Sequence, residues 1–135
     1  MVNVVDLMAL FPADVHPHGM EPARFVELFT EDRPVVFAFH GYQRVIHQLI
    51  HGRPHSERFH VRGFNEHGTT TTPFDMVVLN EMSRYHLCLV ACSLLPEQTR
   101  SLREHCEEQL LAHRRYIREH FEDMPEVRDF VWSTP

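Results

Sequence analysis

Lysine is absent from this chain of 135 residues, so arginine supplies all thirteen of its cationic side chains. A chain without lysine has no amine side chain that could form a Schiff base with a carbonyl substrate. Glycine is scarce too, and its five copies form neither a GxGxxG fingerprint nor a Walker A loop. GxSxG is also missing, and no cysteine stands in a turn beside a histidine. These absences argue against a self-contained nucleotide enzyme and against nucleophilic catalysis.

Excess positive charge and long hydrophobic runs are also lacking. The formal net charge is -6 at pH 7, which disfavours binding to a phosphate backbone, so we expect no nucleic-acid partner. The longest apolar stretch, residues 85–95, is too short to span a bilayer, and no signal peptide opens the chain. The three cysteines are odd in number and lack a CxxC pair, which fits a reducing compartment. We therefore expect a cytoplasmic protein with no membrane partner.

Histidine, by contrast, is abundant, and its twelve copies raise the possibility of a metal site. His16 and His18 flank a proline that restricts the convergence of their rings, and no HExxH motif occurs. His47 and His51 stand four residues apart on an expected helix, yet no third ligand has an obvious position. We expect no metal site in this chain, although a histidine-dependent metalloenzyme remains the third functional alternative.

Strand-like and helix-like segments alternate along the chain. This order predicts an α/β fold, a three-layer α/β/α sandwich around a small and mostly parallel sheet. The length and a hydrophobic content of 43% indicate a single domain over residues 1–135. The expected strands are residues 2–7, 35–39 and 59–64. The expected helices begin at Pro22, cover residues 42–51, begin at Pro73 with a break near Ser83, and cover residues 97–121.

Finer expectations concern the helix ends and the apolar stripe of the last helix. Thr72 is expected to accept from the first N–H groups of the helix that begins at Pro73, and Pro125 is expected to stop the last helix. Phe130 and Trp132 are expected to dock the C-terminal tail on the body of the protein. The stripe of the last helix is expected to comprise Leu102, Cys106, Leu110, His113 and Ile117.

Polar groups recur at the ends of the expected strands. They are His40, Tyr42, His60, Arg62 and Thr72. If both histidines lie near the carboxyl edge of the sheet, close to Arg62 and to the helix start at Thr72, the group would form a pocket for an anion or for the polar surface of a partner. The alternative for His40 and His60 is a buried histidine whose ring nitrogens are satisfied by hydrogen bonds. The sequence leaves both readings open.

Collinear blocks of the chain resemble the C-terminal domain of phosphoketolases that act on xylulose 5-phosphate and fructose 6-phosphate. They include Phe37-Ala38-Phe39-His40-Gly41-Tyr42 and Thr71-Thr72-Pro73-Phe74-Asp75-Met76. The remaining blocks are residues 4–8, 16–20, 28–30, 60–63 and 123–128. Together they extend over nearly the whole chain. The sequence departs from the pattern at Gln43, where the family favours proline.

The resemblance implies a fold like the C-terminal domain of transketolase, here without the family's usual first strand and helix. It implies that the full enzyme uses thiamine diphosphate and Mg²⁺ and releases acetyl phosphate and an aldose phosphate. The cofactor and substrate sites of the family lie in two larger N-terminal domains, so no cofactor and no catalytic residue is expected in this chain. Structural and subunit contacts are then its leading function, and the alternative is a stand-alone module that binds an anion or metabolite.

The expected partners follow from the same resemblance. They are the thiamine-binding domains of phosphoketolase or another copy of this chain, and we expect a homo-oligomer. Without the family's first strand, the strand at residues 35–39 would have a bare hydrophobic edge that invites self-pairing or lowers stability.

Overall fold

The computed structural model describes residues 1–66, 68, 70–95 and 99–125. Helices and strands both occur, which confirms the α/β class. The chain divides into two compact units, residues 1–63 and residues 64–135, and each is described by itself. The expectation of a single domain stays a prediction.

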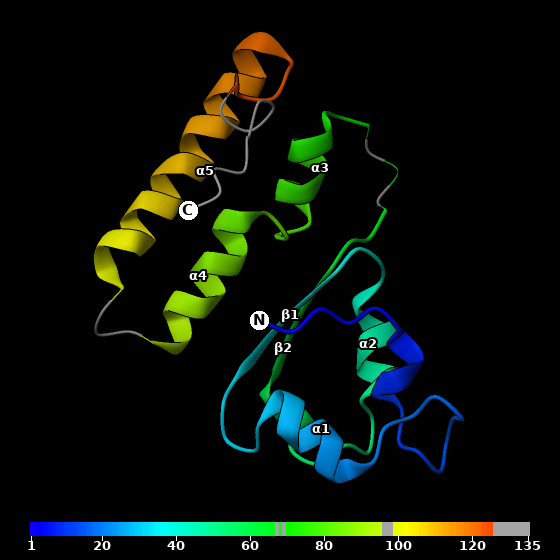
Figure 1. Cartoon of the computed structure of the whole chain (residues 1–135). Helices are drawn as coiled ribbons and strands as arrows, with labels where there is room; N and C mark the ends of the chain where they lie inside the picture. The colour runs from blue at the N-terminus through cyan, green and yellow to red at the C-terminus, as the bar shows by residue number, and fades with distance from the viewer. Residues whose placement is uncertain (67, 69, 96–98, 126–135) are drawn as a thin grey trace. The chain divides into compact units, whose positions relative to one another are not determined.

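The first unit contains two strands and two α-helices (Figure 1). Strand β1 (Val35–Phe39) pairs in parallel with strand β2 (Phe59–Gly63), and the register sets Val35 opposite Phe59 and Phe39 opposite Gly63. Both strands agree with the expectation from sequence. The other elements are η1 (Leu7–Leu10), α1 (Pro22–Phe29), α2 (Gln43–Leu49) and η2 (Ser56–Arg58), of which the η elements are 3₁₀ helices.

The expected strand at residues 2–7 is wrong. The described residues contain a two-stranded sheet, and the N-terminal segment instead leads into the 3₁₀ helix η1. Asp6 is the reason in the local sequence, because its Oδ1 accepts a hydrogen bond of 2.9 Å from the N–H of Met8 and so caps the helix. Aspartate side chains that bind nearby backbone groups compete with strand pairing in this way.

The core of the first unit is built around phenylalanine. Phe25 and Phe29 come from one face of α1, and their ring centroids lie 4.8 Å apart. Both rings contact that of Phe59 at the start of β2, with centroid distances of 5.8 and 5.4 Å. Phe25 is fully buried, so this aromatic cluster fixes α1 against the amino-terminal end of the sheet.

Arg53 holds the N-terminal segment in place from inside the first unit. Only 4% of this residue is exposed, and its Nε and Nη1 donate hydrogen bonds of 2.8 Å to the carbonyl oxygens of Leu10 and Met20. Its Nη2 donates to the carbonyl of Phe11, and its guanidinium lies 4.5 Å from the ring centroid of Phe25. Burial lowers the pKa of Arg53 from its ordinary value. One buried side chain thus satisfies several loop carbonyls that would otherwise be left without partners.

Arg58 performs a similar task at the end of α1. Its Nη2 donates a hydrogen bond of 2.7 Å to the carbonyl of Thr30, which follows the last residue of the helix. Its Nη1 donates to the carbonyls of Phe29, at 3.2 Å, and of Arg33. The last carbonyls of a helix have no intrahelical partner, so Arg58 supplies one from the entry to β2.

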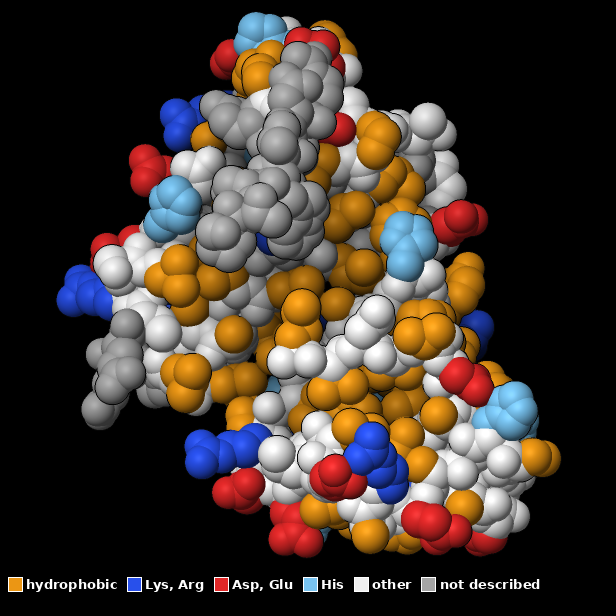
Figure 2. All heavy atoms as spheres, in the orientation of Figure 1, with side chains coloured by type: hydrophobic (Ala, Val, Ile, Leu, Met, Phe, Trp, Pro, Cys, Tyr) orange, Lys and Arg blue, Asp and Glu red, His pale blue; other side chains and the backbone are white. Residues whose placement is uncertain are grey.

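An apolar cavity of about 320 Å³ runs beside β1. Met1, Val2 and Val4 line it together with Val35 and Phe37, so the N-terminal segment lies next to the strand without pairing with it. Figure 2 shows hydrophobic side chains exposed on this unit, while charged side chains gather around α1. Among the described residues β1 pairs with β2 alone. Self-pairing through this edge, which the sequence led us to expect, stays a prediction.

The second unit is helical, with α3 (Pro73–Leu79), α4 (Arg84–Leu94) and α5 (Arg100–His120) (Figure 1). The predicted start at Pro73 and the predicted break near Ser83 are both confirmed, since Ser83 caps α4 by accepting from the N–H of His86. Helices α4 and α5 pack side by side. None of the helices in the described ranges is long and apolar enough to cross a membrane.

Helix α5 differs from the expectation at its ends and in part of its stripe. It ends at His120, where Phe121 adopts a left-handed conformation with φ 57°, so Pro125 is not what stops it. Of the predicted stripe, Cys106 and His113 are buried, but Leu102 is 46% exposed. The apolar stripe runs along most of α5, but other helices cover only part of it. Leu102 belongs to the part that stays exposed. Phe130 and Trp132, expected to dock the tail, lie outside the described residues, as do residues 97 and 98 at the expected helix start.

The cysteines lie where α4 meets α5. Cys92 and Cys106 are 2% exposed, and Cys88 is half-buried. Burial, together with contacts to Cys106 and Cys92, raises the pKa of Cys88 to about 12. A thiol with such a pKa is almost entirely protonated at neutral pH, which suits a packing role rather than a nucleophile.

Candidate functional site

The strand register separates two of the five predicted site residues. His60 pairs with Val36, the second residue of β1, whereas His40 follows the last residue of that strand. Four residues of parallel strand span roughly 13 Å, so His60 lies at the amino-terminal part of the sheet and His40 at its carboxyl end. The reading that places both histidines at the carboxyl edge is therefore wrong for His60, because β2 runs from His60 toward that edge. Arg62, opposite Ala38, lies nearer to it.

The carboxyl ends of the two strands approach each other closely. A Cβ atom on Gly63 would lie 2.5 Å from the carbonyl oxygen of Gly41 and 2.7 Å from the backbone nitrogen of Gln43. Only glycine fits at such a distance, so Gly63 lets the turn after β1 pack on the end of β2. This turn carries His40 and Tyr42, and Tyr42 is 48% exposed with the Arg44 guanidinium 5.8 Å from its ring centroid. The turn is thus fixed by backbone packing while Tyr42 remains accessible.

Thr72, the fifth predicted residue, lies in the second unit at the start of α3. It precedes the helix as expected, but its side chain makes no capping bond to the helix. Its Oγ1 instead donates a hydrogen bond of 2.5 Å to Oδ1 of Asp123, whose Oδ2 accepts at 3.1 Å from the N–H of Phe74. The carboxylate of Asp123 therefore occupies the positive helix end that the sequence suggested for an external anion.

A second polar chain lies beside this cap. Thr71 Oγ1 donates a hydrogen bond of 2.9 Å to Oδ2 of Asp75, and Oδ1 of Asp75 lies 3.4 Å from Nε2 of His113. His113 comes from α5, is completely buried, and has its ring perpendicular to that of Phe74 with centroids 5.0 Å apart. Neither ring nitrogen of His113 has a well-oriented hydrogen bond within the described part of the chain. The 3.4 Å separation is therefore a close contact rather than a formed hydrogen bond.

These two polar chains tie the start of α3 to α5 and to the segment after it. Sequence reasoning singled out Thr72 but missed Asp123 and did not give His113 a polar role. Asp123 belongs to the block at residues 123–128 that resembles phosphoketolases, and this was the one sign in the sequence that it matters. Nothing local in the sequence connects it to Thr72, which is 51 residues away. The partners are side chains of this chain itself, so the arrangement fixes structure rather than opening a reaction site.

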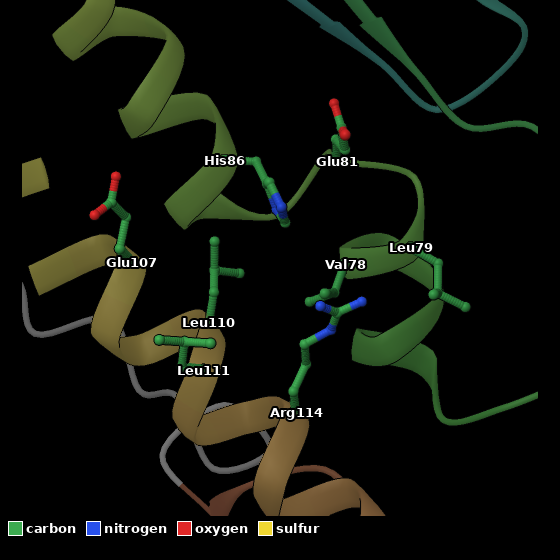
Figure 3. A pocket seen from close by; sticks show the side chains of 8 residues that line it. All are labelled: Val78, Leu79, Glu81, His86, Glu107, Leu110, Leu111 and Arg114. Carbon is green, nitrogen blue, oxygen red and sulfur yellow. The ribbon is translucent and has the colours of Figure 1, made fainter. Parts of the chain in front are cut away.

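A cleft of about 520 Å³ lies within the second unit (Figure 3). Helix α5 contributes Glu107, Leu110, Leu111 and Arg114 to one wall, and Figure 3 shows the Arg114 side chain directed toward Val78 of α3. The residues that line the cleft are Val78, Leu79, Glu81, His86, Glu107, Leu110, Leu111 and Arg114. Leucines on the walls with charges around them are typical of a surface that contacts another polypeptide or a ligand.

Comparison with known proteins places this arrangement in a family. A sequence model described as the XFP C-terminal domain matches residues 1–132, which is almost the whole chain. The chain belongs to the phosphoketolase C-terminal domain family. The resemblance found in the residue blocks is thereby confirmed.

Curated phosphoketolases match this chain over nearly its full length. A "Probable phosphoketolase" of Bradyrhizobium diazoefficiens is 54% identical over 135 residues, which are 98% of this chain and 17% of that protein. One of Brucella abortus is 51% identical over 138 residues, covering 100% of this chain and 18% of that protein. "Probable phosphoketolase 2" of Nostoc sp. is 46% identical over 135 residues, which are 98% of this chain and 17% of that protein. The chain thus spans about one sixth of the length of these phosphoketolase relatives.

The described residues of this phosphoketolase domain do not fit a site for thiamine diphosphate and Mg²⁺. Mg²⁺ bound to a diphosphate needs carboxylate or carbonyl oxygens that converge on it. Within the described ranges no three histidine, cysteine, aspartate or glutamate side chains form a group that could hold a metal. The carboxylate of Asp123 is already engaged by Thr72 and by the N–H of Phe74. We therefore assign no step of cofactor chemistry to these residues.

Proposed function

We propose that this chain acts as the non-catalytic C-terminal part of a phosphoketolase, where it supplies structural and subunit contacts. The full enzyme would use thiamine diphosphate and Mg²⁺ to cleave xylulose 5-phosphate or fructose 6-phosphate with inorganic phosphate, giving acetyl phosphate and an aldose phosphate. The observation that carries the proposal is the match to the family of C-terminal domains over residues 1–132. The phosphoketolases that contain such a domain are much longer, since this chain covers only 17–18% of their length.

The site geometry supports a structural role within that enzyme. The polar groups at the start of α3 bind each other, since Asp123 binds Thr72 and Asp75 lies against His113. The partners we propose are the thiamine-binding domains of phosphoketolase and a second copy of the chain, in the cytoplasm. The three free cysteines, of which Cys92 and Cys106 are buried, support that location. Binding of an external anion at Thr72 gains no support, because a carboxylate of the chain already lies there.

A domain replacement tests this function. The C-terminal domain of the Bradyrhizobium phosphoketolase, 54% identical to this chain, is exchanged for it, and acetyl phosphate formation is measured from xylulose 5-phosphate and inorganic phosphate. We expect the chimera to keep activity within about tenfold of the parent enzyme and to keep its KM for the ketose, since catalytic groups lie elsewhere.

Two matched samples complete that experiment. The same enzyme without its C-terminal domain should lose activity or assembly, and the isolated chain with thiamine diphosphate and Mg²⁺ should form no acetyl phosphate. Acetyl phosphate production by the isolated chain would contradict the proposal, as would an unchanged activity in the enzyme that lacks the domain.

A further inference from the structure

The polar side chains that line the cleft in the second unit differ in where they point. Figure 3 shows Arg114 of α5 and His86 of α4 directed into the cleft. The carboxylates of Glu81 and Glu107 lie at its rim and point outward in the same view. Within the described ranges the Arg114 side chain takes part in no ion pair or hydrogen bond. The inside of the cleft therefore presents a positive charge, while its rim carries two negative ones.

Apolar surface lies beside the inward positive charge. Val78 of α3 and Leu110 of α5 both line the cleft, and Figure 3 shows them on opposite walls. Leu110 and Arg114 stand four residues apart on α5, so they share one face of the helix. The volume of about 520 Å³ is in the range of sites that hold small molecules. One small ligand could therefore contact the guanidinium and the apolar walls at the same time.

Hydrogen bonds fix the walls of the cleft. The Nδ1 atom of His86 lies 2.7 Å from Oγ of Ser83, a residue that is 1% exposed. In the turn after α3, Asn80 Nδ2 donates a hydrogen bond of 2.9 Å to the carbonyl of Met76. Glu81 follows in a left-handed conformation, with φ 53°, that residues other than glycine seldom adopt. A site whose walls are already ordered loses little conformational entropy when a ligand binds.

We propose that the cleft binds a small aliphatic carboxylate, with its charged group at Arg114 and its chain between Val78 and Leu110. The guanidinium presents parallel N–H donors that match the two oxygens of a carboxylate. The carboxylates of Glu81 and Glu107 add negative potential at the rim, so a monoanion enters more easily than a doubly charged phosphate ester. The apolar walls favour an aliphatic chain over a hydroxylated one, because burying hydroxyl groups without partners is costly.

The carboxylate site is separate from the start of α3. Val78 lies in the last turn of that helix, whereas Asp123 occupies the positive end beside Thr72. The inference goes beyond the structural role proposed above and does not rest on it. Binding of a carboxylate would leave the result of the domain replacement unchanged, because that experiment measures acetyl phosphate formation.

Titration with hexanoate tests the site. Amide NMR spectra of the full 135-residue chain should show shifts that saturate with one-to-one stoichiometry and are largest around Val78 and Leu110. Arg114→Gln should raise the dissociation constant about tenfold or more, because the carboxylate loses its charged partner. Arg115→Gln is the matched control, since Arg115 is exposed on the same helix but does not line the cleft. It should leave the dissociation constant within about threefold of the parent value.

Two further probes separate the charge of the ligand from its chain. Hexanol keeps the chain without the charge and should bind about tenfold more weakly than hexanoate. Hexyl phosphate carries the same chain on a more highly charged group and should also bind more weakly. The same spectra show whether each variant is folded, and Arg114→Lys, expected between the parent and Arg114→Gln, serves if the latter is not.

Four results would overturn the proposal. They are the absence of saturable shifts with hexanoate, the largest shifts outside the cleft, equal affinity of the parent chain and Arg114→Gln, and binding of hexanol or hexyl phosphate as tight as that of hexanoate.

Discussion

Replacing Arg53 with methionine is expected to lower the free energy of unfolding by about 3–5 kcal/mol, measured by urea denaturation. The guanidinium donates to the carbonyls of Leu10, Phe11 and Met20, and 4% of the residue is exposed. Methionine fills much of the same space but donates nothing, so these carbonyls lose their partner where water has little access. Bonds to a charged donor contribute more than neutral ones, which makes the loss large.

Two comparisons separate the effect of the lost hydrogen bonds from that of a lost charge. Arg24→Met removes an arginine that pairs with Glu27 on the surface, where both side chains are more than half exposed, so stability should change by less than about 1 kcal/mol. Arg53→Lys keeps the charge but not the planar fork of donors, and it should fall between the parent and Arg53→Met. Equal stability of Arg53→Met and Arg24→Met would show that the N-terminal segment does not depend on Arg53.

Asp123→Ala is expected to lower the free energy of unfolding by about 2–3 kcal/mol and to loosen the start of α3. The substitution removes two hydrogen bonds at once, from Thr72 Oγ1 and from the N–H of Phe74. It also removes a negative charge from the positive end of the helix. Hydrogen exchange of the amides in the first turn of α3 should quicken more than that of the amides in the middle of α5.

Glu108→Ala provides the comparison for Asp123→Ala. It removes a carboxylate from an exposed position of α5, so stability should change by less than about 0.5 kcal/mol. Asp123→Asn keeps an oxygen for Thr72 but offers an amide where Phe74 needs an acceptor, and it should lose about half as much as Asp123→Ala. If the amides of α3 exchange no faster in Asp123→Ala than in Glu108→Ala, the capping role is excluded.

Local signals in the sequence predicted most of the elements. Prolines at Pro22 and Pro73 marked two helix starts, and the two strands were marked by the apolar run at residues 35–39 and by the alternation of apolar and polar side chains at residues 59–64. Proline at the first turn and β-branched or aromatic runs act through backbone dihedrals, so neighbouring residues suffice to recognise them. The expected strand at residues 2–7 failed because an apolar run needs a pairing partner, while the carboxylate of Asp6 caps the 3₁₀ helix nearby.

The candidate site was harder to predict because its contacts join distant parts of the chain. Thr72 was recognised as a helix start, but its partner Asp123 lies 51 residues further on, and Arg53 reaches carbonyls 33 and 42 residues earlier. The position of His60 depended on the strand register, which composition alone does not set. An anion-binding role for His40, Tyr42, His60, Arg62 and Thr72 as a group stays a prediction, and Thr72 already has an acidic partner.

The mass of the polypeptide that carries this sequence in its source cells tests the central claim most directly. An immunoblot of cell lysate, with antibody raised against the 135-residue chain, measures it. The account predicts a band several-fold heavier than 16.0 kDa, since the chain covers 17–18% of the phosphoketolases it matches. A single band at 16.0 kDa would contradict it, because a chain of that mass has no room for the thiamine-binding domains.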